Sequence, residues 1–296
     1  MQAKKAQNTQ IAYGNSWRYF CAWCRAAGRE PLPATPETVR EFVTWRLTTG
    51  KRFYTVYGDA NGIAHVHREA GLPSPVDKSV RAYLNAARRE LKEEPGGKAA
   101  LTYDQVRRIA KTFDHSPRGV RDRAMFLLNF ASGWRRAEMV ALDYEDLAFG
   151  PQGLILWQRS SKTDQIAEGR VVGIAPGKKK LTCPVRAIET WLALRGKWKG
   201  PLFTHVAQTG EITRKRLGKR ADVLYRLVKR KIQEIGGEAG EYGAHSLRAG
   251  MITEAAKHGA NEASIMQRTG HKSSRVLQRY VRPATVFDLD PLKGVL

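Results

Sequence analysis

The amino-acid sequence predicts a mainly α-helical fold in two domains: an N-terminal four-helix domain and a C-terminal helix-rich domain with a small β-sheet. Its 296 residues exceed what one small module needs to bury a core. Apolar residues recur at helical spacing over most of the chain, and two short β-prone runs interrupt that spacing past its midpoint. The polar segment 92–98 has no apolar anchor, so we expect domains at 1–92 and 100–296 joined by a linker at 93–99.

The first 92 residues carry the pattern of four helices. The buried face of the first is predicted to consist of Tyr13, Trp17, Phe20, Cys21 and Cys24. Thr35 is a good N-cap and Pro36 suits the first turn of a second helix, whose inner face is then lined by Val39, Phe42, Val43 and Leu47. A third helix is expected over 53–69, before the breaker run 71–75, and a fourth is marked by Val80, Leu84 and Leu91.

Cys21 and Cys24 have the spacing of half a zinc site. No second cysteine pair or nearby histidine pair completes a ligand set, and the i, i+3 spacing places both thiols on one helix face. We therefore expect both thiols to pack in the core, with metal or redox chemistry as the alternative. Three cysteines in the whole chain fit a reducing compartment.

The second domain is predicted to open with the capping-box spacing of Thr102 and Gln105. An amphipathic helix follows from Arg121 to Phe130 and ends around residues 132–133. The β-prone runs 154–157 and 170–174 flank a polar tip that carries Lys162, which predicts a hairpin or a small sheet edge. From Cys183 onward the pattern is helical, with turns near 200–201 and 236–243.

Positive charge dominates both predicted domains. Lys and Arg number 51 against 28 Asp and Glu, a net charge of +23, of which residues 1–99 supply +7 and the remainder +16. Such a balance indicates a polyanionic partner, either nucleic acid or a membrane surface. The sequence has neither a sustained basic amphipathic helix nor a run of about 18 apolar residues. Because the N-terminal residues also lack the apolar core of a signal peptide, we expect a cytoplasmic, nucleoid-associated protein that binds DNA.

Cations stand where two helices are expected to begin. Arg135 and Arg136 follow Gly133, and His245 and Arg248 occupy the opening turns of a later helix. The helix dipole disfavours a cation in the first turn by about 0.3–1 kcal/mol unless an anion shares the site. Either pair alone has a simpler interpretation as a solvated basic face, whereas a bound phosphate accounts for both pairs together.

Tyr280 lies shortly after His271, in a helical segment at 274–281 that Pro283 should end within a residue or two. A tyrosine on such a frayed helix end can swing toward a substrate; packing on its apolar helix neighbours is the structural alternative. A free phenol, with a pKa near ~10, is only about 0.1% ionised at neutral pH. Attack on a phosphodiester therefore needs a proton acceptor, such as His245, and strong positive potential.

Together these motifs resemble those of the tyrosine recombinases of the phage integrase type, over nearly the whole chain. The matching segments are the first arginine box at 131–138, the hairpin lysine at 161–163, the histidine–arginine box at 245–248, the second histidine at 270–271, and Tyr280. Trp134 and Arg136 depart from the family's pattern, which has aliphatic residues there, so Arg136 rivals Arg135 for the first arginine. The N-terminal helices resemble the family's SAM-like core-binding domain more weakly.

The resemblance implies a role for each residue of a candidate catalytic set. These are Tyr280 as nucleophile, His245 as general base, Arg135 and Arg248 as phosphate and transition-state ligands, His271 as a phosphate hydrogen-bond donor, Lys162 as the acid for the leaving 5′-oxygen, and Glu138 as support for an arginine or histidine. A surface i, i+3 charge pair is the alternative for Glu138.

The family's reaction forms a 3′-phosphotyrosine link without a metal or cofactor. The resemblance further implies that both domains form a clamp around double-stranded DNA. A homotetramer would assemble on two specific recombination sites, from a monomer or weak oligomer in the absence of DNA. The short tail after Tyr280 would dock on a neighbouring subunit or pack on its own domain.

Three other functions are open at this point. A type IB topoisomerase shares the covalent chemistry but relaxes DNA as a monomer. A non-enzymatic architectural protein explains the charge but gives no reason for the assembled residue types. A metal-dependent nuclease needs clustered carboxylates, for which the acidic run 143–146 is the local candidate.

Overall fold

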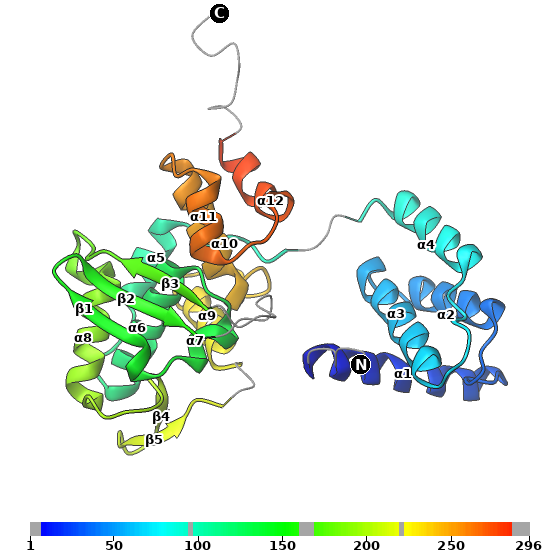
Figure 1. The fold of residues 1–296 in the computed structure, drawn as a ribbon, viewed down its shortest axis with the longest axis horizontal. Coiled ribbons are helices and arrows are strands. Elements are labelled where there is room, and N and C mark those ends of the chain that lie inside the picture. The colour runs from blue at the N-terminus through cyan, green and yellow to red at the C-terminus, as the bar shows by residue number, and fades with distance from the viewer. Residues whose placement is uncertain (1–6, 94–96, 160–168, 219–221, 286–296) are drawn as a thin grey trace, which may run out of the picture. The chain divides into compact units, whose positions relative to one another are not determined.

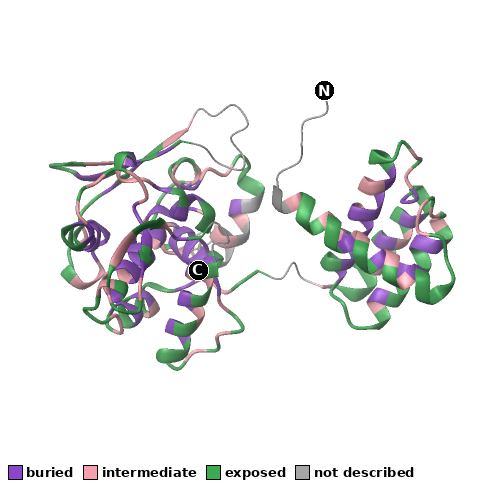
Figure 2. Cartoon of the chain, turned by 90° about the horizontal axis from the view of Figure 1, so that it is seen from below, coloured by how far each residue is buried: buried purple, intermediate pink, exposed green. Residues whose placement is uncertain are grey.

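The computed structural model describes residues 7–93, 97–159, 169–218 and 222–285. The chain divides into two compact units, Met1–Gly97 and Lys98–Leu296, and the division falls within the expected linker (Figure 1). Each unit has its own buried interior (Figure 2). Within the described ranges, no helix combines the length and the apolar character that crossing a membrane requires.

The first unit consists of four helices at the predicted places. They are α1 Gln7–Ala27, α2 Pro36–Thr48, α3 Phe53–Glu69 and α4 Lys78–Leu91. The Thr35 hydroxyl accepts a hydrogen bond from the Thr38 N–H and so caps α2. Asp77 caps α4 in the same way, through the N–H of Val80.

The core of the first unit is formed by the predicted faces. Phe20, Cys24, Val39, Phe42, Val43, Val80 and Leu84 are buried, and Tyr13, Trp17, Cys21 and Leu47 are partly buried. Burial raises the pKa of the Cys24 thiol to about 11, which keeps it protonated and apolar. Leu91 belongs to the fourth helix as predicted, but it is the last residue of α4, two turns beyond Leu84, and is 45% exposed.

Helices also dominate the second unit. They are α5 Tyr103–Ala110, α6 Pro117–Ser132, α7 Arg136–Ala141, α8 Pro184–Arg195, α9 Asp222–Glu234, α10 Ala244–Lys257, α11 Glu262–Thr269 and α12 Ser274–Thr285, with short 3₁₀ turns η1 Tyr144–Asp146 and η2 Lys180–Thr182. The capping box of Thr102 and Gln105 is confirmed at the start of α5. Helix α6 begins four residues earlier than predicted, since Ser116 caps it and Pro117 fills its first position.

Two small antiparallel sheets accompany these helices. The predicted hairpin is confirmed as β2 Gly153–Gln158 and β3 Arg170–Ile174, and β1 Leu147–Gly150 adds a third strand beside β2. Strands β4 Thr204–Val206 and β5 Ile212–Arg216 form a second hairpin inside the region predicted to be helical. That prediction failed because β4 is very short and β5 is mostly basic, so neither shows apolar alternation.

The main core of the second unit lies between α6, α8 and the inward side chains of β2 and β3. Met125, Phe126, Leu127 and Leu128 of α6 are buried, as predicted, but the helix is buried on nearly all sides and is not amphipathic. Even the charged residues Arg121 and Asp122 are buried, each only 4% exposed, and an ion pair between them balances their charges. A smaller apolar cluster of Met251, Ile252, Ala256, Ile265 and Leu277 joins α10, α11 and α12.

Helix α12 corrects the prediction for the segment around Tyr280. The helix continues through Pro283 to Thr285, so Pro283 does not end it and Tyr280 does not lie on a frayed end. Proline lacks one N–H donor and thereby removes one i to i−4 hydrogen bond, here close to the C-terminal end of the helix. Tyr280 is instead held near the middle of α12, partly buried against the α10–α12 cluster.

Candidate active site

A tight turn between α6 and α7 brings the first arginine segment to the candidate site, which is called the pocket below and consists of Arg135, His245, Arg248, His271 and Tyr280. Gly133 ends α6 with a φ of +64°, in the left-handed region that glycine adopts at low cost. The chain then reverses, and Arg135 becomes the N-cap residue of α7. Asn129 Nδ2 donates to the carbonyl of Trp134 (3.0 Å) and holds the turn against α6.

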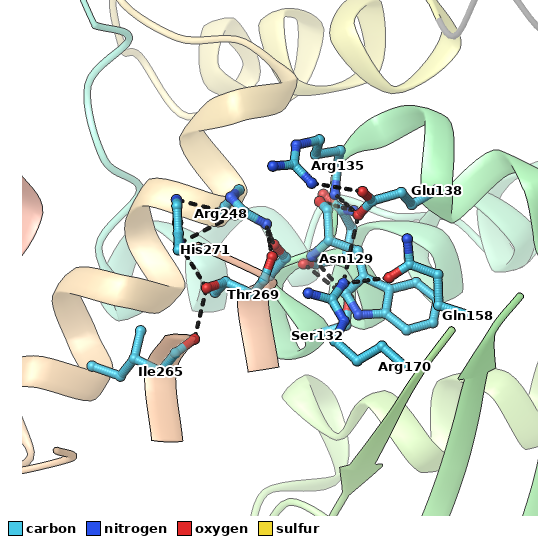
Figure 3. A network of polar contacts seen from close by, with 12 residues as sticks. Asn129, Ser132, Arg135, Glu138, Gln158, Arg170, Arg248, Ile265, Thr269 and His271 are labelled. Atoms are coloured by element: carbon cyan, nitrogen blue, oxygen red, sulfur yellow. Dashed lines mark hydrogen bonds and ion pairs between the residues drawn. The ribbon is translucent and has the colours of Figure 1, made fainter. Parts of the chain in front are cut away.

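Glu138 fixes Arg135 at both its backbone and its side chain. One carboxylate oxygen accepts from the Arg135 N–H and the other from Arg135 Nη1, each at 2.8 Å (Figure 3). Glu138 is 8% exposed, so it is not the surface charge pair of the alternative interpretation. The Arg135 side chain is only partly buried. Its guanidinium can therefore contact a substrate while Glu138 holds the backbone N–H and Nη1.

Arg136 lies in different surroundings. Its guanidinium is 3.6 Å from the Asp222 carboxylate at the start of α9, and both side chains are largely exposed. It makes no hydrogen bond to Glu138 among the described residues. Of the two rivals, the geometry therefore favours Arg135 as the arginine of the pocket.

Arg248, in the second turn of α10, links three segments at the centre of the site. Nη1 donates to the carbonyls of Gly133 and Thr269, each at 2.7 Å, and Nη2 lies 3.1 Å from His271 Nε2 (Figure 3). The residue is 1% exposed. Burial, and then the nearby Arg135, lower its pKa to about 10, so it stays charged at neutral pH.

His271 follows the Gly270 C-cap of α11 and lies against Arg248. Its Nδ1 is 2.7 Å from the hydroxyl of Thr269, which fixes the ring. Burial, followed by the cations Arg248 and Arg135, lowers the pKa of His271 to about 4. The ring is therefore neutral at physiological pH.

His245 and Tyr280 lie side by side at the edge of this cluster. His245 Nε2 is 3.1 Å from Tyr280 Oη, a contact that joins the first turn of α10 to α12. Desolvation by the surrounding protein, and then Arg248 and Arg135, lower the pKa of His245 below its usual 6.5. The Tyr280 ring also packs on the apolar α10–α12 cluster, so this residue combines a packing contact with the contact to His245.

One member of the predicted set lies outside the part of the chain that the structure describes. Lys162, expected at the tip of the β2–β3 hairpin, falls in 160–168, outside the described residues. The hairpin itself extends to the rung formed by Gln158 and Arg170, directly before that segment. The tail beyond Thr285, with the segment 286–289 that we expect to dock on a neighbouring subunit or pack on its own domain, is likewise outside the described residues.

The acidic run 143–146 has protein partners for each of its carboxylates. Asp143 pairs with Arg216, Asp146 pairs with Arg159, and Glu145 accepts from the N–H of Gly200 (2.9 Å). Within the described parts of the chain, no group of three potential metal-ligating side chains is present. These occupied carboxylates lend no support to the nuclease hypothesis.

Arg170, which none of the sequence motifs indicated, enters the pocket from β3. Alternation along the strand gave the signal: Val172 and Ile174 face inward, and a period of two puts Arg170 on the same face. A cation on the inward face of a strand requires partners, and those of Arg170 include Gln158 and Glu138.

The assembled groups can perform acid–base chemistry on a phosphodiester. A hydroxyl lies within hydrogen-bond reach of a neutral imidazole, and fixed guanidinium groups supply positive charge beside it. The cluster draws on five separated regions: the α6–α7 turn, β3, α10, the turn after α11, and α12.

Residues 99–285 match the model of the phage integrase family. The chain belongs to this family. An integrase/recombinase xerD homolog of Selenomonas ruminantium is 33% identical over 97% of this chain and 85% of its own. The recombinase cre of Escherichia phage P1 is 24% identical, over 90% of this chain and 81% of its own.

Solved structures with a similar fold include other integrases. The Tn1549 transposon integrase, in complex with transposon right-end DNA, superposes with a TM-score of 0.68 at 14% identity, covering 97% of this chain and 95% of its own. A lambda integrase dimer bound to a COC′ core site gives a TM-score of 0.66 at 18% identity, covering 95% and 90%. At these identities the likeness concerns the fold.

Proposed function

We propose that this protein is a site-specific DNA recombinase that cleaves and rejoins strands through a 3′-phosphotyrosine intermediate formed by Tyr280. The observation that carries the proposal is the 3.1 Å contact between Tyr280 Oη and His245 Nε2, beside Arg135 and Arg248. Membership of the phage integrase family supports the same reaction. Relatives named as recombinases align over more than four-fifths of their length, which favours recombination over simple relaxation of DNA.

In the proposed reaction His245 accepts the phenolic proton while Tyr280 Oη bonds to phosphorus. The Nε2 atom must be unprotonated to do so, and the lowered pKa of His245 keeps it in that form at neutral pH. The bond from phosphorus to the 5′-oxygen breaks as the phosphotyrosine bond forms. Attack by a 5′-hydroxyl from a partner strand reverses the step, so the bond energy is conserved and no nucleotide cofactor is needed.

Arg135 and Arg248 would stabilise the negative charge on the non-bridging oxygens. Both hydrogens of Arg248 Nη1 are committed to carbonyls, so Arg248 would act through Nη2 and Nε. Glu138 leaves Arg135 Nη2 and Nε available in the same way. Each guanidinium is thus oriented by the protein before the phosphate arrives, and donors that need no reorganisation stabilise a transition state most effectively.

His271 and Lys162 complete the proposed set. A neutral His271 can donate one ring N–H to the phosphate, although it must then release a contact to Thr269 or Arg248. By resemblance to the family, Lys162 would protonate the leaving 5′-oxygen.

The proposed substrate is double-stranded DNA carrying specific sites. The positive charge of residues 1–99 and of the remainder supports contact by both units, as in a clamp. Recombination exchanges strands between two sites, and we therefore propose a homotetramer on DNA.

Mixing two site-bearing DNA molecules of different length would test the pairing of sites. A complex that contains both DNA molecules supports recombination, whereas complexes with one site alone would favour a topoisomerase.

The test of the proposal is covalent trapping on nicked DNA, from which the cleaved fragment diffuses away. Tyr280→Phe should bind DNA with unchanged affinity but form no denaturant-resistant adduct. Tyr225→Phe, a change of the same kind on α9, serves as the control and should retain the adduct. Mass spectrometry should find the nucleotide on the peptide that contains Tyr280; an adduct that persists in Tyr280→Phe would assign the nucleophile elsewhere.

A further inference from the structure

Arg170 occupies a position that its sequence neighbours make costly for a cation. It opens β3 on the inward face, in line with the buried Val172 and Ile174. Its side chain is 14% exposed, and burial lowers its pKa. A buried guanidinium is tolerated only when the surrounding groups satisfy it, so its contacts indicate what it does.

The contacts of Arg170 join separate parts of the pocket. Nη2 donates to Gln158 Oε1 at 2.5 Å, across the last described rung of the hairpin, and lies 3.7 Å from Glu138 Oε2 (Figure 3). The guanidinium also lies over the Trp134 ring, 5.6 Å from its centroid. Trp134 is one of the two departures from the family's arginine box, and in this chain it forms the apolar support for Arg170.

The opposite edge of the guanidinium packs on the turn that leads to His271. A Cβ atom added at Gly270 would overlap Arg170 Nη1 and come within 3.0 Å of Cζ. Gly270 also has a φ of +69°. The backbone conformation therefore favours glycine at this position, and the missing side chain leaves the space that the Arg170 guanidinium occupies.

Glu138 consequently lies between two cations. Arg135 occupies one of its oxygens with Nη1 and the other with its backbone N–H, while Arg170 approaches the second oxygen from the strand. The second cation attracts, from 3.7 Å, the carboxylate that holds Arg135. It also draws part of the negative charge of Glu138, which leaves Arg135 with more positive potential for a phosphate.

We propose that Arg170 is a positioning residue for strand cleavage: it holds Glu138, and through Glu138 the guanidinium of Arg135, in the orientation that the phosphate requires. Its side chain is only 14% exposed and contacts Gln158, Trp134 and Glu138, so it acts through Glu138 and not by touching DNA. The inference rests on the proposed function, since it concerns the rate of cleavage by Tyr280.

The experiment is a double-mutant cycle on single-turnover cleavage of nicked DNA. Arg170→Gln should slow cleavage about tenfold or more while changing the DNA dissociation constant by less than about threefold. Arg170→Lys, which keeps the charge, should recover part of the rate. If Arg170 acts through Glu138, the double variant Arg170→Gln/Glu138→Gln should cleave no more slowly than the slower single variant.

Arg216→Gln is the matched control. Arg216, on β5, donates to the carbonyls of Val140, Ala141 and Leu142 and pairs with Asp143, so it braces the other end of α7 without contacting Glu138. Its effect on cleavage should be small and should multiply with that of Glu138→Gln. Thermal unfolding of every variant identifies losses that come from folding alone.

Three outcomes would overturn the inference: wild-type cleavage by Arg170→Gln, equal slowing by Arg170→Lys and Arg170→Gln, or independent effects of Arg170→Gln and Glu138→Gln. If Arg170→Gln does not fold, Gln158→Leu, which removes the hydrogen bond to Arg170, replaces it in the same cycle. Absence of any Tyr280 adduct in the wild type would instead refute the proposed function.

Discussion

Arg135 and Arg136 are neighbours in the chain but have different partners. Glu138 fixes Arg135 from two sides, whereas Arg136 reaches outward to Asp222. The contrast arises because Arg135 is the N-cap of α7 and Arg136 is its first helical residue, so their side chains leave the helix in different directions.

The two arginines should therefore differ in their contribution to cleavage. Arg135→Ala removes a preorganised donor and should slow single-turnover cleavage by roughly 10²–10³. Arg136→Ala loses an exposed ion pair, so its cleavage rate should stay within about tenfold of the wild type. A larger loss in Arg136→Ala than in Arg135→Ala would reverse the assignment.

The surroundings of His245 predict how cleavage depends on pH. His245 must be neutral to accept the Tyr280 proton, and burial with the nearby Arg248 and Arg135 lowers its pKa below 6.5. Protonation on acidification removes the base, so the rate should be flat above about pH 6.5 and fall below it. The neighbouring His271 has a pKa of about 4, so it stays neutral at the pH values where His245 becomes protonated.

Single-turnover cleavage measured from about pH 5 to 8 at constant ionic strength checks this dependence. A midpoint above pH 7 would contradict the role of His245 as a base with a lowered pKa. In His245→Gln the rate should be low throughout, and the dependence on this group should disappear.

At the scale of elements, α10 is positioned by a close backbone contact. A Cβ atom at Gly250 would overlap the carbonyl oxygen of Leu101 and lie 3.0 Å from the Phe130 ring. The Leu101 N–H also donates to the Ser246 carbonyl, so the strand-like segment before α5 runs against α10. Because α10 carries His245 and Arg248, this contact helps to set the pocket.

Gly250→Ala should therefore destabilise the second unit by about 1–3 kcal/mol, because neither backbone can move freely. Gly58→Ala is the matched control: Gly58 lies within α3, and an added Cβ meets nothing within 4 Å. That change should stabilise its helix by about 0.5–1 kcal/mol. Urea unfolding of both variants provides the measurement, and a stabilised Gly250→Ala would refute the close contact.

At the scale of the whole molecule, the charge of +23 sets the strength of DNA binding. Neutralising phosphates releases counterions, so the logarithm of the binding constant should fall linearly with the logarithm of salt concentration. With about 6–10 phosphate contacts, affinity should fall by roughly 10³–10⁵ between 50 and 200 mM salt. The Tyr280→Phe variant is suitable for this measurement because the DNA then stays intact. A binding constant that does not change with salt concentration would contradict a protein that binds both flanks of a duplex.

The sequence by itself determined the helical plan and the residue types of the pocket. Caps and breakers such as Thr35, Thr102 and Gly133 act within a few residues, so their effect can be predicted locally. The spacing of His245, Arg248, His271 and Tyr280 carried the family resemblance without any knowledge of contacts. Local signals failed for the very short strand β4, and for Pro283, which the end of α12 accommodates.

Only the tertiary structure decided which charges share a partner. The pairing of Arg136 with Asp222, the burial of Arg248 against the carbonyls of Gly133 and Thr269, and the approach of Arg170 to Glu138 all depend on segments far apart in the chain. A buried ion pair is favourable or costly according to the geometry of all its neighbours, and no local pattern encodes that geometry.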